Sequence, residues 1–178
     1  MARRIAYCGD PPLTKADLTA WLQETESTVH GAVVDLIIPA VVGQCETITG
    51  AAIRLAKYEE VWHPPYRFGG WLDIGQVRSV DLVQRVDTDV AVAPVRYVVS
   101  HDMRQTSFRL LDGAQYPIRI EYQAGIDLTL HPQVKTWLLM QAASLYAQRE
   151  TLTTEKLNLL PVGFINSMLA DITVPARF

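Results

Sequence analysis

Residues 132–150, PQVKTWLLMQAASLYAQRE, form the longest helical pattern in the sequence. Nearly every side chain between positions 134 and 147 is apolar, and Pro132 fits the first turn, where a helix does not use the N–H that proline lacks. At about 100° per residue, one narrow stripe holds the few polar side chains and one indole: Trp137, Gln141, Ser144 and Gln148. A helix with so little polar surface is either the centre of a domain or a helix that faces another subunit.

A membrane span is the competing interpretation of this helix. Lys135 and the polar stripe leave its apolar part short of the roughly 20 residues that a span needs. A secretory signal is not expected either, because Gly9-Asp10-Pro11-Pro12 ends the short apolar stretch that follows Arg3 and Arg4. We therefore expect a chain that is made in a cytoplasm and has no membrane partner.

Two further helices are expected near the N-terminus. Thr14 is a suitable N-cap for the first, because Asp17 follows three residues later, as in a capping box. The second runs from about 33 to 49 on apolar positions at helical spacing, and Gly50 can end it in the left-handed conformation. Pro39 fits this helix only if it begins near Asp35; otherwise the proline kinks it.

Residues 51–125 change to the alternating pattern of strands. Short strands are expected near 51–62, 71–74, 77–86, 95–99, 108–111 and 118–122, and Asp112-Gly113 is a turn signal between the last two. The long helix is expected over 131–160 and a C-terminal segment over 161–178, with one or two helical turns at 164–169 and an extended tail at 173–178. The prediction is a single α+β domain, 1–178, with a small helical core (13–50 and the long helix), an inserted, mostly antiparallel β section and a C-terminal tail.

Composition limits the possible functions. The chain is 49% hydrophobic and 20% charged, so its 178 residues can form a core. Its net charge of −3 comes without a run of one sign, so it has no basic face of the kind that binds phosphates regardless of sequence. Cys8 and Cys45 lie in unrelated contexts and predict two buried thiols rather than a disulfide framework.

The residues that could perform chemistry are isolated. None of the four histidines has a second ligand at metal spacing. His101-Asp102 and Glu59-Glu60 are neighbours in sequence, and neighbours on a strand point apart. A nucleophile motif such as Gly-x-Ser-x-Gly is missing from the sequence. We therefore predict no catalytic, cofactor-binding or metal-binding residue and no enzymatic activity.

The order of motifs resembles the head–tail connector (adaptor, or head-completion) proteins of tailed bacteriophages. Residues 13–18, LTKADL, are similar to the opening helix of that family, and the Thr49-Gly50 pair ends a similar second helix. Residues 118–125, IRIEYQAG, are similar to its strand ending in Tyr-x-Ala-Gly, and the long helix closes on Tyr-x-x-Arg-Glu at 146–150. Residues 160–169 resemble its short terminal helix. Pro39 and the region 104–116 depart from the pattern.

This resemblance implies a structural virion protein located in the neck, between capsid and tail. It implies a ring, typically of twelve copies, that binds the portal, presents a surface to stopper or tail proteins and extends the channel through which double-stranded DNA passes during packaging and ejection, without sequence-specific binding. The polar stripe of the long helix would then face the neighbouring subunit. The C-terminal segment would dock on the portal through its apolar side chains: Val162, Phe164, Ile165, Met168, Leu169, Val174, Pro175 and Phe178.

Two alternatives remain from the sequence. One is a tail-completion or stopper-type neck protein, a class that tends to be more uniformly β. The other is a small hydrolytic enzyme that uses His101, Asp102 or Glu59, although none of these has a positioned partner in the sequence.

Overall fold

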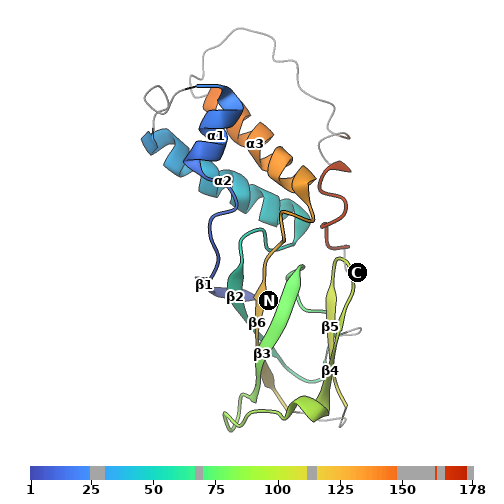
Figure 1. Ribbon diagram of the computed structural model, residues 1–178. Helices are drawn as coiled ribbons and strands as arrows, with labels where there is room; N and C mark the ends of the chain where they lie inside the picture. Colours follow the sequence, from blue (N-terminus) through green and yellow to red (C-terminus); the bar gives the residue numbers. More distant parts are fainter. Residues whose placement is uncertain (25–30, 67–69, 112–115, 148–162, 164–166, 176–178) are drawn as a thin grey trace. The chain divides into compact units, whose positions relative to one another are not determined.

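The computed structural model describes residues 1–24, 31–66, 70–111, 116–147, 163 and 167–175 (Figure 1). The chain divides into two compact units, and each combines segments that are distant in sequence. The β unit comprises Met1–Asp10, Gly50–Ile126 and Asp171–Phe178; the helical unit comprises Pro11–Thr49 and Asp127–Ala170. The α+β class is confirmed, with three helices in the described chain and a β section inserted between the second and the third.

The helical unit contains α1 (Lys15–Leu22), α2 (Gly31–Thr49) and α3 (Pro132–Ala147). The predicted capping box is present, because the Thr14 backbone N–H donates to Asp17 Oδ2 (2.9 Å) and the Asp17 N–H donates to Thr14 Oγ1 (3.2 Å). Asp17 also accepts a hydrogen bond from Lys135 Nζ at 2.7 Å, which joins α1 to α3. The cap and the ion pair together stabilise a helix of only two turns.

α2 begins at Gly31, two residues before the predicted start, and Pro39 lies well inside it. The helix therefore does not begin near Asp35, the one arrangement in which the sequence placed Pro39 close to the first turn. Proline has no N–H to donate to the Asp35 carbonyl, so the middle of α2 lacks one hydrogen bond of the regular ladder. The C-terminal end is as predicted, since Gly50 follows Thr49 with φ at +66°.

The β unit is built on a four-stranded antiparallel sheet in the order β1-β2-β6-β3. Its strands are β1 (Arg3–Tyr7), β2 (Ala56–Trp62), β3 (Val77–Arg85) and β6 (Ile118–Ala124). β4 (Tyr97–His101) follows a short 3-10 turn, η1 (Pro94–Arg96), and pairs with β5 (Thr106–Leu110) in a separate hairpin.

Strict alternation of buried and partly exposed side chains explains the central strands. The inward residues of β2 and β6 form the core of the unit, where the Tyr58 and Tyr122 rings stack 5.7 Å apart. Phe108 of β5 adds an edge-to-face contact with Trp62, so the hairpin packs on the same core as the sheet.

Two strand expectations need correction. The sequence suggested that residues 108–111 and 118–122 form two strands on either side of one turn. Instead, β5 pairs with β4, whereas β6 pairs with β2 and β3. The stretch 71–74 is not a strand and contributes only an isolated bridge from Trp71 to Ser107. The turn residues 112–115 lie outside the described chain.

Candidate functional site

The side chains that could have formed a catalytic pair serve the β4–β5 hairpin instead. His101 Nδ1 lies 3.1 Å from the Thr106 hydroxyl, and Asp102 Oδ1 accepts the Met103 backbone N–H at 2.8 Å. His101 and Asp102 therefore support the turn of this hairpin. Among the described residues, no group of three His, Cys, Asp or Glu side chains could hold a metal ion.

Glu59 and Glu60 point to opposite faces of β2, as expected. Glu59 lies on the outer face, where it pairs with Arg3 (3.0 Å) and Arg119 (3.6 Å). Glu60, in contrast, is fully buried. Sequence reasoning missed this burial, although the strand alternation contains the signal, because Glu60 has the same parity as the buried Tyr58 and Trp62.

The Glu60 carboxylate is satisfied by three donors. It accepts hydrogen bonds from Trp62 Nε1 (2.8 Å), from the Asp73 backbone N–H (2.7 Å) and from the Tyr122 hydroxyl. Burial, and then the nearby Glu60 carboxylate, raise the pKa of Tyr122 far above its usual value, so the phenol remains a donor. This cluster ties β2, β6 and the segment after Gly70 together, which is a structural function.

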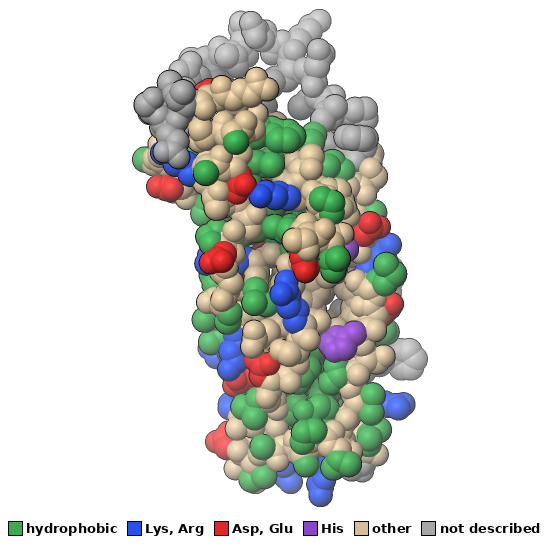
Figure 2. All heavy atoms as spheres, in the orientation of Figure 1, with side chains coloured by type: hydrophobic (Ala, Val, Ile, Leu, Met, Phe, Trp, Pro, Cys, Tyr) green, Lys and Arg blue, Asp and Glu red, His purple; other side chains and the backbone are tan. Residues whose placement is uncertain are grey.

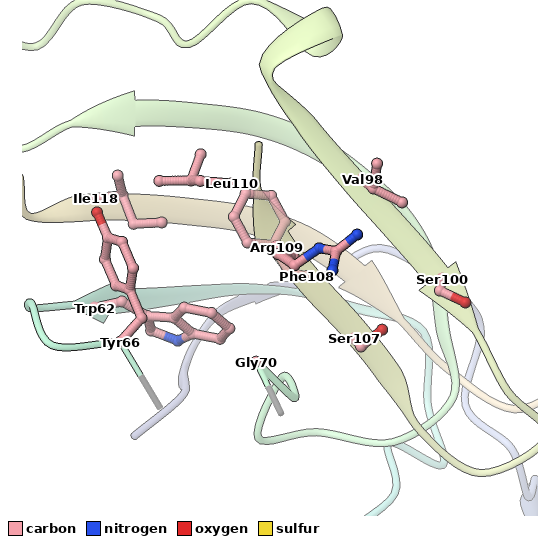
Figure 3. Close-up of a pocket in the computed structure, with 10 residues that line it drawn as sticks. All are labelled: Trp62, Tyr66, Gly70, Val98, Ser100, Ser107, Phe108, Arg109, Leu110 and Ile118. Atoms are coloured by element: carbon pink, nitrogen blue, oxygen red, sulfur yellow. The ribbon is translucent and has the colours of Figure 1, made fainter. Parts of the chain in front are cut away.

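A cavity of about 400 Å³ opens within the β unit beside β5 (Figure 3). Its walls are mainly apolar and aromatic, and its one charged side chain is Arg109. The lining residues are Trp62, Tyr66, Gly70, Val98, Ser100, Ser107, Phe108, Arg109, Leu110 and Ile118. The two serines and the arginine have no acid or histidine beside them in this lining, so it offers a binding surface and no nucleophile–base pair.

Charge is dispersed over the surface. On the face drawn in Figure 2, lysines, arginines and acidic side chains are intermingled, and no single-sign patch stands out. On the outer face of the sheet, many of these charges are paired, for example Lys57 with Glu121 at 2.6 Å. This distribution agrees with the absence of a basic run in the sequence.

The predicted subunit-interface residues on α3 differ in their exposure. Trp137 is only 2% exposed, so its side chain belongs to the interior of the protomer. Gln141 is half-buried and Ser144 is exposed, with its hydroxyl donating to the Met140 carbonyl at 2.8 Å. Gln148 lies outside the described residues. The interface remains a prediction, and Trp137 offers it almost no accessible surface.

The predicted portal-docking residues are described only in part. Val162, Phe164, Ile165 and Phe178 lie outside the described chain. Leu169 is buried, Met168 is half-buried and Pro175 is exposed. Val174 packs over Gly50 in the β unit, where a Cβ on the glycine would lie 3.3 Å from the valine Cβ. Docking on the portal also remains a prediction. Leu169 offers it almost no accessible surface, because the protomer already covers this side chain.

The most unusual surface lies on α2. By length and composition, Gly31–Thr49 is apolar enough to cross a membrane, a test that core helices also pass, yet only 22% of its apolar window is buried. Leu36 is 76% exposed and Ile48 is 47% exposed. The sequence shows an apolar helix here, but only the packing shows that much of it faces outward.

The cysteines correct a further expectation. Cys45 is buried on α2, as predicted, but Cys8 is exposed, and both thiols are free.

The structure defines the class of protein as an α+β chain. Its described residues form a unit of three helices and a small antiparallel β unit. The chain is similar to one in a structure titled "Virion of native gene transfer agent (GTA) particle", with a TM-score of 0.73, 17% identity, and coverage of 99% of this chain and 97% of that chain. It is also similar to chains in the neck of an empty GTA particle computed with C6 symmetry (TM-score 0.74, 16% identity) and in the neck of a native GTA particle computed with C12 symmetry (0.68, 18%). Both alignments again cover 99% of this chain and 97% of the other.

At these identities the likeness concerns the fold, and it confirms at that level the resemblance seen in the sequence. No protein-family model matches the sequence, and no curated protein matches it at a significant level.

Proposed function

We propose that this chain is a structural protein of a virion neck, an adaptor whose copies form a ring between the portal of the capsid and the stopper or tail proteins. The observation that carries the proposal is the alignment of both units, over 99% of the chain, with chains from GTA particles and their necks. A match to only one unit would support a shared module; a match to both supports a shared role.

The ring is supported by the neighbouring structures, whose necks were computed with C6 and C12 symmetry. In the proposed ring, double-stranded DNA passes through the lumen without sequence-specific contacts. The intermingled surface charges suit such a channel, because a strongly basic wall would hold the phosphates. The three helices of the described chain also favour the adaptor over a stopper or tail-completion protein, a class that tends to be more uniformly β.

The proposal is tested by locating the chain in purified particles. Gold labelling of a tagged chain should mark the neck, once per particle and at the vertex that carries the tail. Label on the capsid shell, or particles that assemble fully without the chain, would contradict the proposal.

Docking on the portal is tested separately by co-purification. Deletion of residues 161–178 should abolish binding to the portal, while the full chain binds. The matched control is Ala170→Ser, which changes an exposed side chain of the segment outside the predicted docking residues and leaves the buried Leu169 in place. A deleted chain that still binds the portal fully would exclude this segment as the docking element.

A further inference from the structure

The outward side of α2 is uncharged and mostly apolar along the whole helix. At about 100° per residue, the buried side chains Val34, Val41 and Cys45 gather on one side. The opposite side consists of exposed residues, none of them charged: Ala32, Leu36, Pro39, Ala40, Gly43 and Thr47. Asp35 and Glu46, the only charged residues of α2, lie between the two sides. A solvent-facing helix normally places charged residues opposite its buried stripe.

α3 has a similar outward side. Its inward residues, among them Leu138 and Ala142, are buried. On the opposite side, exposed and half-buried residues form a second stripe without a charge: Thr136, Met140, Ala143, Ser144 and Ala147. Lys135, the one charged residue of α3, lies off this stripe and pairs with Asp17. The helical unit therefore has two uncharged outward surfaces on two different helices.

We propose that the outward side of α2 in one copy packs against the outward side of α3 in the next copy, head to tail. This inference rests on the proposed ring. A closed ring needs two different, complementary patches on each copy, and these two stripes meet that requirement. The necks that share this fold were computed with C6 and C12 symmetry, so a second copy is the occupant that the comparisons favour.

The side chains on the two stripes suit close helix packing. Ala40 and Gly43 leave a shallow surface near the middle of α2, which lets a neighbouring helix approach to the usual 8–10 Å between axes. Met140 is flexible and fills irregular gaps well. This arrangement also gives Ser144 the interface role predicted from sequence, while Trp137 supports α3 from the interior.

The size of the contact is reasonable for a ring. The 19 residues of α2 span about 28 Å, and a face about 10 Å wide gives roughly 280 Å² per copy. A standard interface buries about 800 Å² per partner, so the helix pair would be its apolar centre, with a polar rim around it. A ring gives every copy two such interfaces.

Gly43 offers a clean test, because a Cβ at this position meets no heavy atom within 4 Å. Gly43→Ala should raise the melting temperature of the monomer by about 2–4 °C, since glycine is a poor helix former. Gly43→Glu should fold equally well and lose self-association, as measured by sedimentation velocity over a concentration series. The matched control is Ala16→Glu, which adds the same charge at an exposed position of α1 and should self-associate like the wild type.

A cross-linking experiment tests the head-to-tail geometry. In a Cys8→Ser background, which removes the exposed thiol, Ala40→Cys and Met140→Cys place one thiol near the middle of each stripe. A short thiol–thiol cross-linker should convert the double variant into a ladder of multimers, and neither single variant should give one. Dimers from Ala40→Cys alone would show α2 facing α2 and would overturn the proposal.

The remaining outcomes are also decisive. If Gly43→Glu forms rings as the wild type does, the proposed contact between α2 and α3 of neighbouring copies is wrong. The proposed neck function would be unaffected by that result. A chain that is monomeric at all concentrations and floats with phosphatidylcholine vesicles would show that α2 contacts a lipid surface instead. If labelling places the chain at the neck but the double variant gives no ladder of cross-linked multimers, only the proposed contact is rejected. If the chain is absent from the neck, the proposed function itself is rejected.

Discussion

The space around a glycine differs between the two units of this protein. In the β unit, a Cβ added to Gly125 would lie 2.7 Å from the Leu55 backbone nitrogen, a distance that real Cβ atoms essentially never show. In the helical unit, a Cβ added to Gly43 would meet nothing within 4 Å. The first glycine is required by packing inside the chain, whereas the second has open space around it.

The outer surfaces differ in the same way. The exposed face of the four-stranded sheet carries paired charges, such as Lys57 with Glu121 and Arg119 with Glu59. The outward sides of α2 and α3 carry no charge. A surface with paired charges is well solvated, whereas an uncharged helical surface gains from being covered. The charge pairs therefore solvate the outer face of the sheet, although the β unit also exposes single apolar side chains such as Val95 and Met103. The uncharged sides of α2 and α3 are the surface that we propose another copy covers.

The largest effect is expected from Glu60 in the β unit. Glu60→Ala leaves two buried donors, Trp62 Nε1 and the Tyr122 hydroxyl, and the partly buried Asp73 N–H without their acceptor. Each unsatisfied buried group costs about 1–3 kcal/mol. The expected loss is about 3 kcal/mol or more in the free energy of unfolding, measured by urea denaturation. Glu60→Gln keeps the volume and one acceptor oxygen, so it should lose clearly less. Equal losses would mean that cavity formation, rather than hydrogen bonding, dominates.

A smaller loss is expected from Gly125→Ala. The new methyl group must displace the Leu55 backbone, and overpacking of this kind costs about 1–3 kcal/mol. Gly43→Ala is the matched substitution in the helical unit and should stabilise the chain. If both variants melted at the wild-type temperature, the contrast between a tight β unit and an open helical unit would be lost.

Local signals in the sequence predicted much of this fold. The capping box of Thr14 and Asp17 depends on residues three apart, so the sequence specifies it directly. The alternation in β2 and β6 depends on which face is buried, and it was likewise visible. The pairing of β5 was not, because Asp112-Gly113 suggested a hairpin with β6, whereas long-range packing pairs β5 with β4.

The candidate interface was harder to predict for a related reason. The sequence identifies α2 and α3 as apolar helices, but it does not show which side of each one the protomer covers. Trp137 shared a stripe with Gln141 and Ser144, yet the protomer buries it. Hydropathy reports the total apolar surface, and only tertiary packing divides that surface between the core and a partner.

The next prediction concerns the cap of α1 and its pH dependence. Partial burial acts to raise the pKa of Asp17, but the hydrogen bonds from Lys135 and Thr14 outweigh it and hold the pKa below the usual 3.8. The stability that this lowered pKa provides is present above the unfolded-state value and is lost as the pH falls through the folded-state value.

Asp17→Asn should therefore destabilise the chain by up to about 1 kcal/mol at neutral pH, because it removes the charge that pairs with Lys135 and leaves the Thr14 cap in place. The difference from wild type should shrink below about pH 4, where the wild-type carboxylate also becomes protonated. Asp35→Asn, at an exposed position of α2, is the control and should have little effect. A difference that stayed constant down to acid pH would exclude the ion pair with Lys135 as its cause.

The smallest effect on the protein is expected from alkylation of its two cysteines. The rate at which each thiol reacts measures how open its unit is to solvent. Burial, and then the charge of Glu46, raise the pKa of Cys45 to about 12, so its thiol is protonated and covered in the folded chain. Cys8 is exposed on the β unit.

Iodoacetamide at about pH 8 should alkylate Cys8 readily and Cys45 only when the helical unit opens, because the thiolate is the reactive form. Mass spectrometry over time gives both rates, and Cys45 should react faster in Asp17→Asn than in Asp35→Asn. Equal modification of both thiols in the native chain would show that the interior of the helical unit is open to solvent.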